Sequence, residues 1–120
     1  MSPPTVLVVD DDPLVRRAMV RALRRTYDVH EAEHAEAASA ILARESIDLL
    51  LSDIWMPDTD GFALAERARA THPGLAMILI TGLMHPDHAA RAEALGVSAV
   101  LLKPVSASRL RDAIENALGA

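Results

Sequence analysis

The chain has 120 residues, no cysteine and a formal net charge of -5 at pH 7. This length predicts one domain over residues 1–120, and the negative charge argues against direct nucleic-acid binding by that domain. The sequence also lacks cysteine, a cleavable leader and any apolar run of about 18 residues. We therefore expect a cytoplasmic protein without a membrane span.

The first predicted strand ends in a cluster of carboxylates. Thr5–Val9 is a short run rich in β-branched residues, and Asp10, Asp11, Asp12 and Pro13 follow it directly. An Asp just before a proline is typical of a helix N-cap, so Asp12 is expected to have this structural role. Asp10 and Asp11 remain as candidates for chemistry.

The next segment predicts an amphipathic helix. Its apolar positions recur at helical spacing and are Leu14, Val15, Ala18, Met19, Ala22 and Leu23. Its other side carries Arg16, Arg17, Arg21, Arg24 and Arg25. We expect these arginines to form a solvated face. A docking surface for an acidic partner is the alternative, because the helix adjoins the acidic loop.

A later strand supplies a further carboxylate. A weak strand and a small-residue helix come first, over residues 27–32 and 35–44. The apolar strand over residues 47–52 then ends at Asp53, where the chain enters a loop punctuated by Pro and Gly. Asp60 is the better N-cap for the helix over residues 62–71. Asp53 is therefore left as a metal ligand or a nucleophile.

The rest of the chain predicts a strand, a helix, a second strand and a last helix. The first three cover residues 77–80, 86–95 and 99–102, and the last follows Ser106. Thr81 and Gly82 end the first of these strands, and Lys103 and Pro104 follow the second. Gly96 is expected at a helix C-cap, and Ser106 is expected at an N-cap.

Five strands that alternate with five helices predict an α/β fold, a three-layer sandwich around a parallel sheet. The carboxyl ends of such strands share one edge, where ligands bind. The polar residues at the ends of strands one, three, four and five should therefore lie together. They are Asp10, Asp11, Asp53, Thr81 and Lys103.

The chemistry of these side chains predicts a metal and a phosphoryl group. Three carboxylates in one pocket repel each other, so their proximity implies a divalent cation. Oxygen ligands without His or Cys favour Mg2+ or Mn2+, which commonly bridge a carboxylate and a phosphoryl group. Asp53 is a competent nucleophile, and Lys103 and Thr81 supply a positive charge and a hydroxyl donor.

The ordered set of motifs resembles the receiver domain of bacterial two-component response regulators over essentially the whole chain. The motifs are Val8-Val9-Asp10-Asp11, Asp53 with Met56-Pro57 and Asp60-Gly61, Thr81-Gly82, Gly96 and Lys103-Pro104. The resemblance implies a flavodoxin-like (βα)5 fold with the strand order 2-1-3-4-5. It also implies a phosphoacceptor signalling function with a histidine kinase as the phosphodonor.

The resemblance further assigns the metal ligands. Asp53 would be the phosphoacceptor and would also bind Mg2+. Asp11 would bind the ion directly, and Asp10 would bind it through water. The backbone carbonyl of Trp55 would be another direct ligand.

The resemblance assigns the switch as well. Thr81 would bind the phosphoryl group, Lys103 would pair with its oxygens, and Pro104 would follow a cis peptide bond. The fourth helix, fifth strand and fifth helix would form the output or homodimer surface. Val100 and Val105 replace the aromatic residues that the family usually has there. We therefore expect movement of Thr81 and shifts of strands and helices to carry the signal.

Two other function classes fit the motifs less well. A Mg2+-dependent phosphotransferase or phosphatase with an aspartyl nucleophile usually has a second Asp two residues later, where this chain has Trp55. A pseudo-receiver that serves only in interactions would normally lack a site residue, and none is missing here. We therefore expect a phosphoacceptor domain and not an enzyme.

The histidines are not expected to form a second metal site. His85 and His88 lie three residues apart, but no third ligand is apparent in the sequence. His30, His34 and His72 are expected at the surface or at strand ends.

Overall fold

The computed structural model of the protein describes residues 2–119. Its five strands are all parallel and lie in the order β2-β1-β3-β4-β5, which confirms the predicted order. The strands are β1 (Thr5–Val9), β2 (Asp28–Ala32), β3 (Leu49–Asp53), β4 (Ala76–Thr81) and β5 (Ala99–Leu102). The flavodoxin-like α/β architecture is therefore also confirmed.

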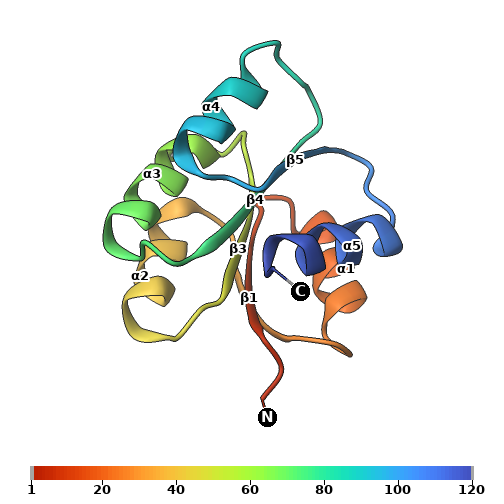
Figure 1. Ribbon diagram of the computed structural model, residues 1–120. Coiled ribbons are helices and arrows are strands. Elements are labelled where there is room, and N and C mark those ends of the chain that lie inside the picture. Colours follow the sequence, from red (N-terminus) through yellow and green to blue (C-terminus); the bar gives the residue numbers. More distant parts are fainter. Residues whose placement is uncertain (1, 120) are drawn as a thin grey trace.

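Five helices cover the sheet. They are α1 (Pro13–Leu23), α2 (Ala35–Arg44), α3 (Gly61–Thr71), α4 (His88–Leu95) and α5 (Ala107–Ala117). Figure 1 shows α1 and α5 on one face of the sheet and the other three helices on the opposite face. Within residues 2–119, none of the helices has the length and apolar character needed to cross a membrane.

Strand β3 lies at the centre of the sheet and carries Asp53 at its end. Leu50 packs into the core under α2 and α3, whereas Leu49 and Leu51 pack into the core under α1 and α5. A strand covered on both faces favours apolar side chains at successive positions, which explains the three leucines, and the buried Ser52 hydroxyl donates to the Asp53 carbonyl. The same packing fixes the position of Asp53 at the end of the strand.

The predicted helix caps are present. The carboxylate of Asp12 accepts hydrogen bonds from the backbone N–H groups at the start of α1, and Asp60 does the same for α3. The Ser106 hydroxyl caps α5. Gly96 ends α4 with a φ of 73°, in the left-handed region that favours glycine.

The boundaries differ from the prediction by one or two residues. Strand β2 begins at Asp28 because the Tyr27 N–H still donates to the Leu23 carbonyl at the end of α1, at 2.9 Å. Helix α4 begins at His88 and not at position 86. The His88 N–H bonds to the His85 carbonyl in a preceding turn, and the Asp87 side chain makes no capping bond.

Three predictions for α1 are wrong. Leu14 and Ala18 were expected in the apolar stripe, but Leu14 is 79% exposed and Ala18 is exposed as well. Arg16 was expected on the solvated face, but only 14% of its side chain is exposed. Its guanidinium bonds to the Asp10 carbonyl and to Glu31, so it packs over the β1–α1 loop.

Candidate functional site

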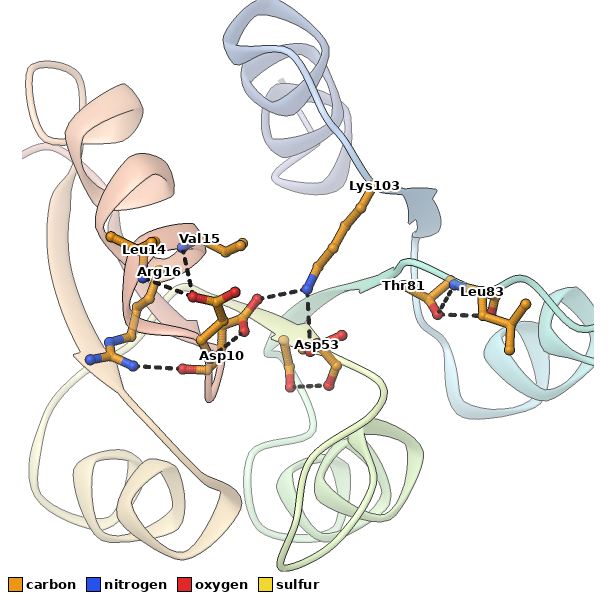
Figure 2. Close-up of polar contacts among 10 residues, drawn as sticks. Asp10, Leu14, Val15, Arg16, Asp53, Thr81, Leu83 and Lys103 are labelled. Carbon is orange, nitrogen blue, oxygen red and sulfur yellow. Dashed lines mark hydrogen bonds and ion pairs between the residues drawn. The ribbon is translucent and has the colours of Figure 1, made fainter.

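The polar residues predicted at strand ends meet at one edge of the sheet. In the strand register Asp53 pairs with Ile80, the residue directly before Thr81. Asp10 follows β1, and Lys103 follows β5. Figure 2 shows Asp10, Asp53 and Lys103 converging from their three strands.

Lys103 bridges the two buried carboxylates. Its Nζ lies 3.0 Å from Oδ2 of Asp10 and 3.3 Å from Oδ2 of Asp53. The backbone N–H of Lys103 donates to the Thr81 carbonyl, and the Lys103–Pro104 peptide bond is cis. Asp10 is completely buried and Asp53 is 5% exposed, so the lysine neutralises charge that solvent cannot reach.

This crowding changes the acidity of the site. Burial raises the pKa of Asp53, and the nearby charge of Asp10 raises it further, although Lys103 and the Trp55 N–H act in the opposite direction. Burial alone would lower the pKa of Lys103. The hydrogen bond and charge of Asp10, together with Asp53, nevertheless raise it, so the ammonium stays protonated.

The acidic cluster fits an oxygen-ligated cation. Asp10, Asp11 and Asp53 each offer a carboxylate oxygen, and these oxygens lie within 4.8 Å of one another. Oδ1 of Asp10 already accepts the Asp12 N–H at 2.9 Å. The Asp11 side chain is exposed and makes no hydrogen bond or ion pair with residues 2–119. Hard oxygen donors without sulfur or imidazole suit Mg2+ or Mn2+.

Arg16 is a site-supporting residue that the sequence analysis missed. Its Nη1 donates to the Asp10 carbonyl at 2.7 Å, and its Nε lies 2.9 Å from Oε1 of Glu31. The guanidinium therefore holds the β1–α1 loop that presents Asp10 and Asp11. The only signal in the sequence was an arginine close to an acidic loop. That signal does not distinguish Arg16 from the other four arginines of this segment.

Thr81 belongs to the same edge but is engaged elsewhere. Its hydroxyl donates to the Leu83 carbonyl at 2.8 Å and accepts the Leu83 N–H at 3.1 Å. Figure 2 shows this side chain joined to Leu83 and apart from the bridge between Lys103 and the two carboxylates. The hydroxyl expected to bind a phosphoryl group thus closes the start of the β4–α4 loop in this structure.

The β3–α3 loop, residues 54–60, is closed at its base. The Gly61 N–H donates to the Ile54 carbonyl at 2.7 Å. A Cβ at position 61 would lie 2.5 Å from the Asp53 carbonyl oxygen and 2.9 Å from Cα of Ile54. Only glycine permits this close approach, so Gly61 helps to set how the chain turns away from Asp53.

An aromatic cluster lies between the β3–α3 loop and the start of α4. Trp55 is 48% exposed, and its ring centroid lies 5.9 Å from that of His85 and 6.2 Å from that of His88. His88 is buried against Phe62 and accepts the His85 N–H through Nδ1. The remaining histidines are half-buried, and His34 and His72 bond to backbone groups.

Comparisons with known proteins agree with this geometry. Residues 6–115 match the family model of the response regulator receiver domain. The chain is 35% identical over 119 residues to response regulator protein PilR of Pseudomonas aeruginosa, covering 98% of this chain and 27% of PilR. It is 36% identical over 118 residues to response regulator receiver protein CpdR of Brucella abortus, covering 94% of this chain and 95% of CpdR.

A solved structure supports the same relationship. The response regulator receiver domain protein of Methanospirillum hungatei superimposes with a TM-score of 0.92 at 30% identity, covering 98% of this chain and 94% of that chain. The chain spans about a quarter of the length of PilR and of transcriptional regulatory protein GlrR of Escherichia coli. The family match extends over most of the chain, and this protein therefore belongs to the response regulator receiver domain family.

Proposed function

We propose that this receiver domain acts in the cytoplasm, and that Asp53 is its phosphoacceptor and takes the phosphoryl group from a histidine kinase. The observation that carries the proposal is the buried Asp53 carboxylate, which lies 3.3 Å from Lys103 and beside the other two carboxylates. Transfer of a phosphoryl group to a carboxylate requires a nucleophile, a cationic partner and a site for a divalent cation. All three are available at this sheet edge.

In the transfer step, a carboxylate oxygen of Asp53 attacks the phosphorus of a phosphohistidine on the kinase. A P–O bond forms and the P–N bond breaks. The imidazole nitrogen leaves with the bonding electron pair and takes up a proton from solvent. Burial makes the Asp53 carboxylate more basic, which favours attack, and the charged Lys103 is available for the phosphoryl oxygens.

Asp10, Asp11 and Asp53 would hold Mg2+ or Mn2+, with the backbone carbonyl of Trp55 as a further ligand. When bound, the ion offsets the negative charge on the phosphoryl oxygens. Asp11 suits direct ligation because its carboxylate has no other contact among the described residues. Asp10 suits ligation through water, because its two oxygens already accept the Asp12 N–H and the Lys103 ammonium.

Signalling would begin when Thr81 exchanges its Leu83 partner for a phosphoryl oxygen. This exchange frees the start of the β4–α4 loop. Met84, which follows Leu83, lines two surface hollows, and Val100 lines both of them too. The change can thus reach α4, β5 and α5 without an aromatic side chain at position 100. These elements would form the output or homodimer surface, and phosphorylation should alter hydrogen exchange over residues 86–118.

The kinase would dock beside the site along α1 and α5. A largely apolar groove of about 580 Å³ runs between these helices and ends at Lys103 and Pro104. Leu14, 79% exposed at the start of α1, extends the apolar surface toward the acidic edge. Leu14→Arg should slow phosphotransfer from the kinase at least tenfold and leave phosphorylation by acetyl phosphate unchanged, whereas equal rates from the kinase would contradict this docking site.

Intact mass spectrometry tests the phosphoacceptor assignment. After treatment with acetyl phosphate and Mg2+, the wild type should gain one phosphoryl group, and Asp53→Asn should gain none. Asp12→Asn is the matched control, since Asn is an equally good helix cap and the variant should still be phosphorylated. An adduct that persists in folded Asp53→Asn would show that another residue is the acceptor.

Phosphate release, measured in the same reaction, separates the other function classes. A phosphatase would release phosphate rapidly over many turnovers, whereas a phosphoacceptor domain with a long-lived phosphoryl group would release it slowly. The side chain two residues after Asp53 is the half-exposed indole of Trp55, which cannot serve as an acid or base. A pseudo-receiver would remain unmodified.

A further inference from the structure

One carboxylate near the site is not part of the acidic cluster. Asp58 lies in the β3–α3 loop, three residues after Trp55, and reaches across to α2. Its Oδ1 accepts the Ala35 N–H at 3.3 Å, and its Oδ2 accepts the Glu36 N–H at 3.1 Å. The carboxylate therefore caps a helix that precedes it by more than twenty residues.

This contact completes the N-terminus of α2. The helix has its own cap, because Nδ1 of His34 accepts the Ala37 N–H at 3.1 Å. Asp58 takes the two preceding N–H groups, which His34 leaves without a side-chain partner. Burial acts in the opposite direction, but the N–H groups of Glu36, Ala35 and Thr59 hold the pKa of Asp58 below its usual range. The carboxylate that makes the contact is therefore ionised at neutral pH.

The contact also holds the loop itself. The loop is closed at its base by the bond between Gly61 and Ile54, and Asp60 is fixed as the cap of α3. Asp58 fastens the middle of the loop to a different helix. Trp55 lies between the base and this attachment, so the two fixed points restrict the directions in which its carbonyl can point.

We propose that Asp58 is a positioning residue that holds the Trp55 carbonyl in place for the metal site. This inference rests on the proposed function, in which that carbonyl binds Mg2+. Asp58 does not touch the ion and acts only through the loop. A ligand that is already ordered loses less conformational entropy on binding, so fastening the loop strengthens ion binding.

Mg2+ affinity measured by calorimetry on the full chain tests the proposal. Asp58→Ala should weaken binding at least fivefold. Asp58→Asn keeps one acceptor oxygen and should fall between that variant and the wild type. Ala40→Gly is the matched control, because it weakens α2 at an exposed position in the middle of the helix and leaves the contacts of Asp58 with Ala35 and Glu36 in place. It should bind Mg2+ within twofold of the wild type.

Hydrogen exchange supplies a second readout that needs no ion. The amides of residues 55, 56, 58 and 59 should exchange faster in Asp58→Ala and remain unchanged in Ala40→Gly. Wild-type affinity in folded Asp58→Ala would overturn the proposal. An equal loss in Ala40→Gly would also overturn it, since the effect would then come from α2. Failure of the wild type to bind Mg2+ would instead overturn the metal site within the proposed function.

Discussion

The acidic side and the threonine side of the site differ in how far they are assembled. On the acidic side, Lys103 already contacts Asp10 and Asp53, and the carboxylates are grouped for a cation. On the other side, the Thr81 hydroxyl is bound within its own loop, and Leu83 is 62% exposed. Under the proposed function, the acidic side is ready for phosphorylation, whereas the threonine side must rearrange to report it.

Removal of Lys103 should have the largest effect, because this residue holds the acidic side together. Lys103→Met leaves the completely buried Asp10 carboxylate without its cationic partner. Breaking such a pair should lower the free energy of unfolding by about 2–3 kcal/mol in the presence of EDTA. Urea denaturation with and without Mg2+ measures this, and Mg2+ should restore most of the loss. Unchanged stability would mean that the lysine does not hold the acidic side together.

The second prediction concerns Asp11. Asp11→Ala should weaken Mg2+ binding at least about tenfold, because a direct ligand is lost from the site. Trp55 fluorescence can follow the titration, since Trp55 lies two residues from Asp53. Asp12→Ala is the control, because it should lower stability by about 1 kcal/mol through the lost cap and leave the affinity unchanged. Tight binding by Asp11→Ala would refute the ligand assignment.

The third prediction concerns the charge of Asp53. Its raised pKa means that the folded state holds the proton more strongly than the unfolded state does. Stability should therefore fall as pH rises through the interval between the two pKa values, and the cost should be fully present at neutral pH. Asp53→Asn should raise the melting temperature by a few degrees at pH 7 in EDTA. It should not do so at a pH low enough to protonate the wild-type carboxyl.

The fourth prediction addresses the threonine side. Thr81→Ala removes the acceptor of the Leu83 N–H, and a net loss of about 1 kcal/mol corresponds to roughly fivefold faster exchange of that amide. Mg2+ affinity should stay within about twofold, because Thr81 does not belong to the acidic cluster. Thr71→Ala, which alters a threonine on α3, is the control and should leave this amide unchanged. A large loss of affinity in Thr81→Ala would show that the two sides are coupled before phosphorylation.

The smallest effect concerns the lifetime of the phosphorylated state. Trp55 and Leu83 are both large, and neither carries a group that can orient a water molecule for hydrolysis. The phosphorylated domain should therefore hydrolyse slowly and depend on a partner for reset. Trp55→Asn and Leu83→Glu should lose the phosphoryl group severalfold faster in single-turnover decay. Unchanged decay in both variants would remove the argument that these side chains exclude water.

The fold and the acidic side were predictable because their signals are local. An unbroken apolar strand that stops at Asp53 indicates a buried parallel strand and a residue at the sheet edge. The caps formed by Asp12 and Asp60 also depend only on residues close by in the sequence. Strand order came from the family resemblance, since periodicity alone does not determine which strands are neighbours.

The features that escaped prediction depend on partners distant in the sequence or on turn geometry. Arg16 on α1 bonds to Glu31 on β2, and Asp58 caps α2, a helix that precedes β3 in the chain. The burial of His88 depends on Phe62, which α3 brings beside it. The bonds between Thr81 and Leu83 depend on the conformation of the β4–α4 loop. The glycine between them, Gly82, permits many conformations and does not specify this one.

The two hydrogen bonds between Thr81 and Leu83 determine what fraction of unphosphorylated molecules keeps the start of the β4–α4 loop closed. If each contributes on the order of 1 kcal/mol, together they favour the closed loop about thirtyfold. Roughly one unmodified molecule in thirty would then have this loop released at any moment. In the proposed switching role of Thr81, phosphorylation must exceed that background to be detected. The strength of these two hydrogen bonds would therefore set the smallest phosphorylated fraction that a downstream partner can detect.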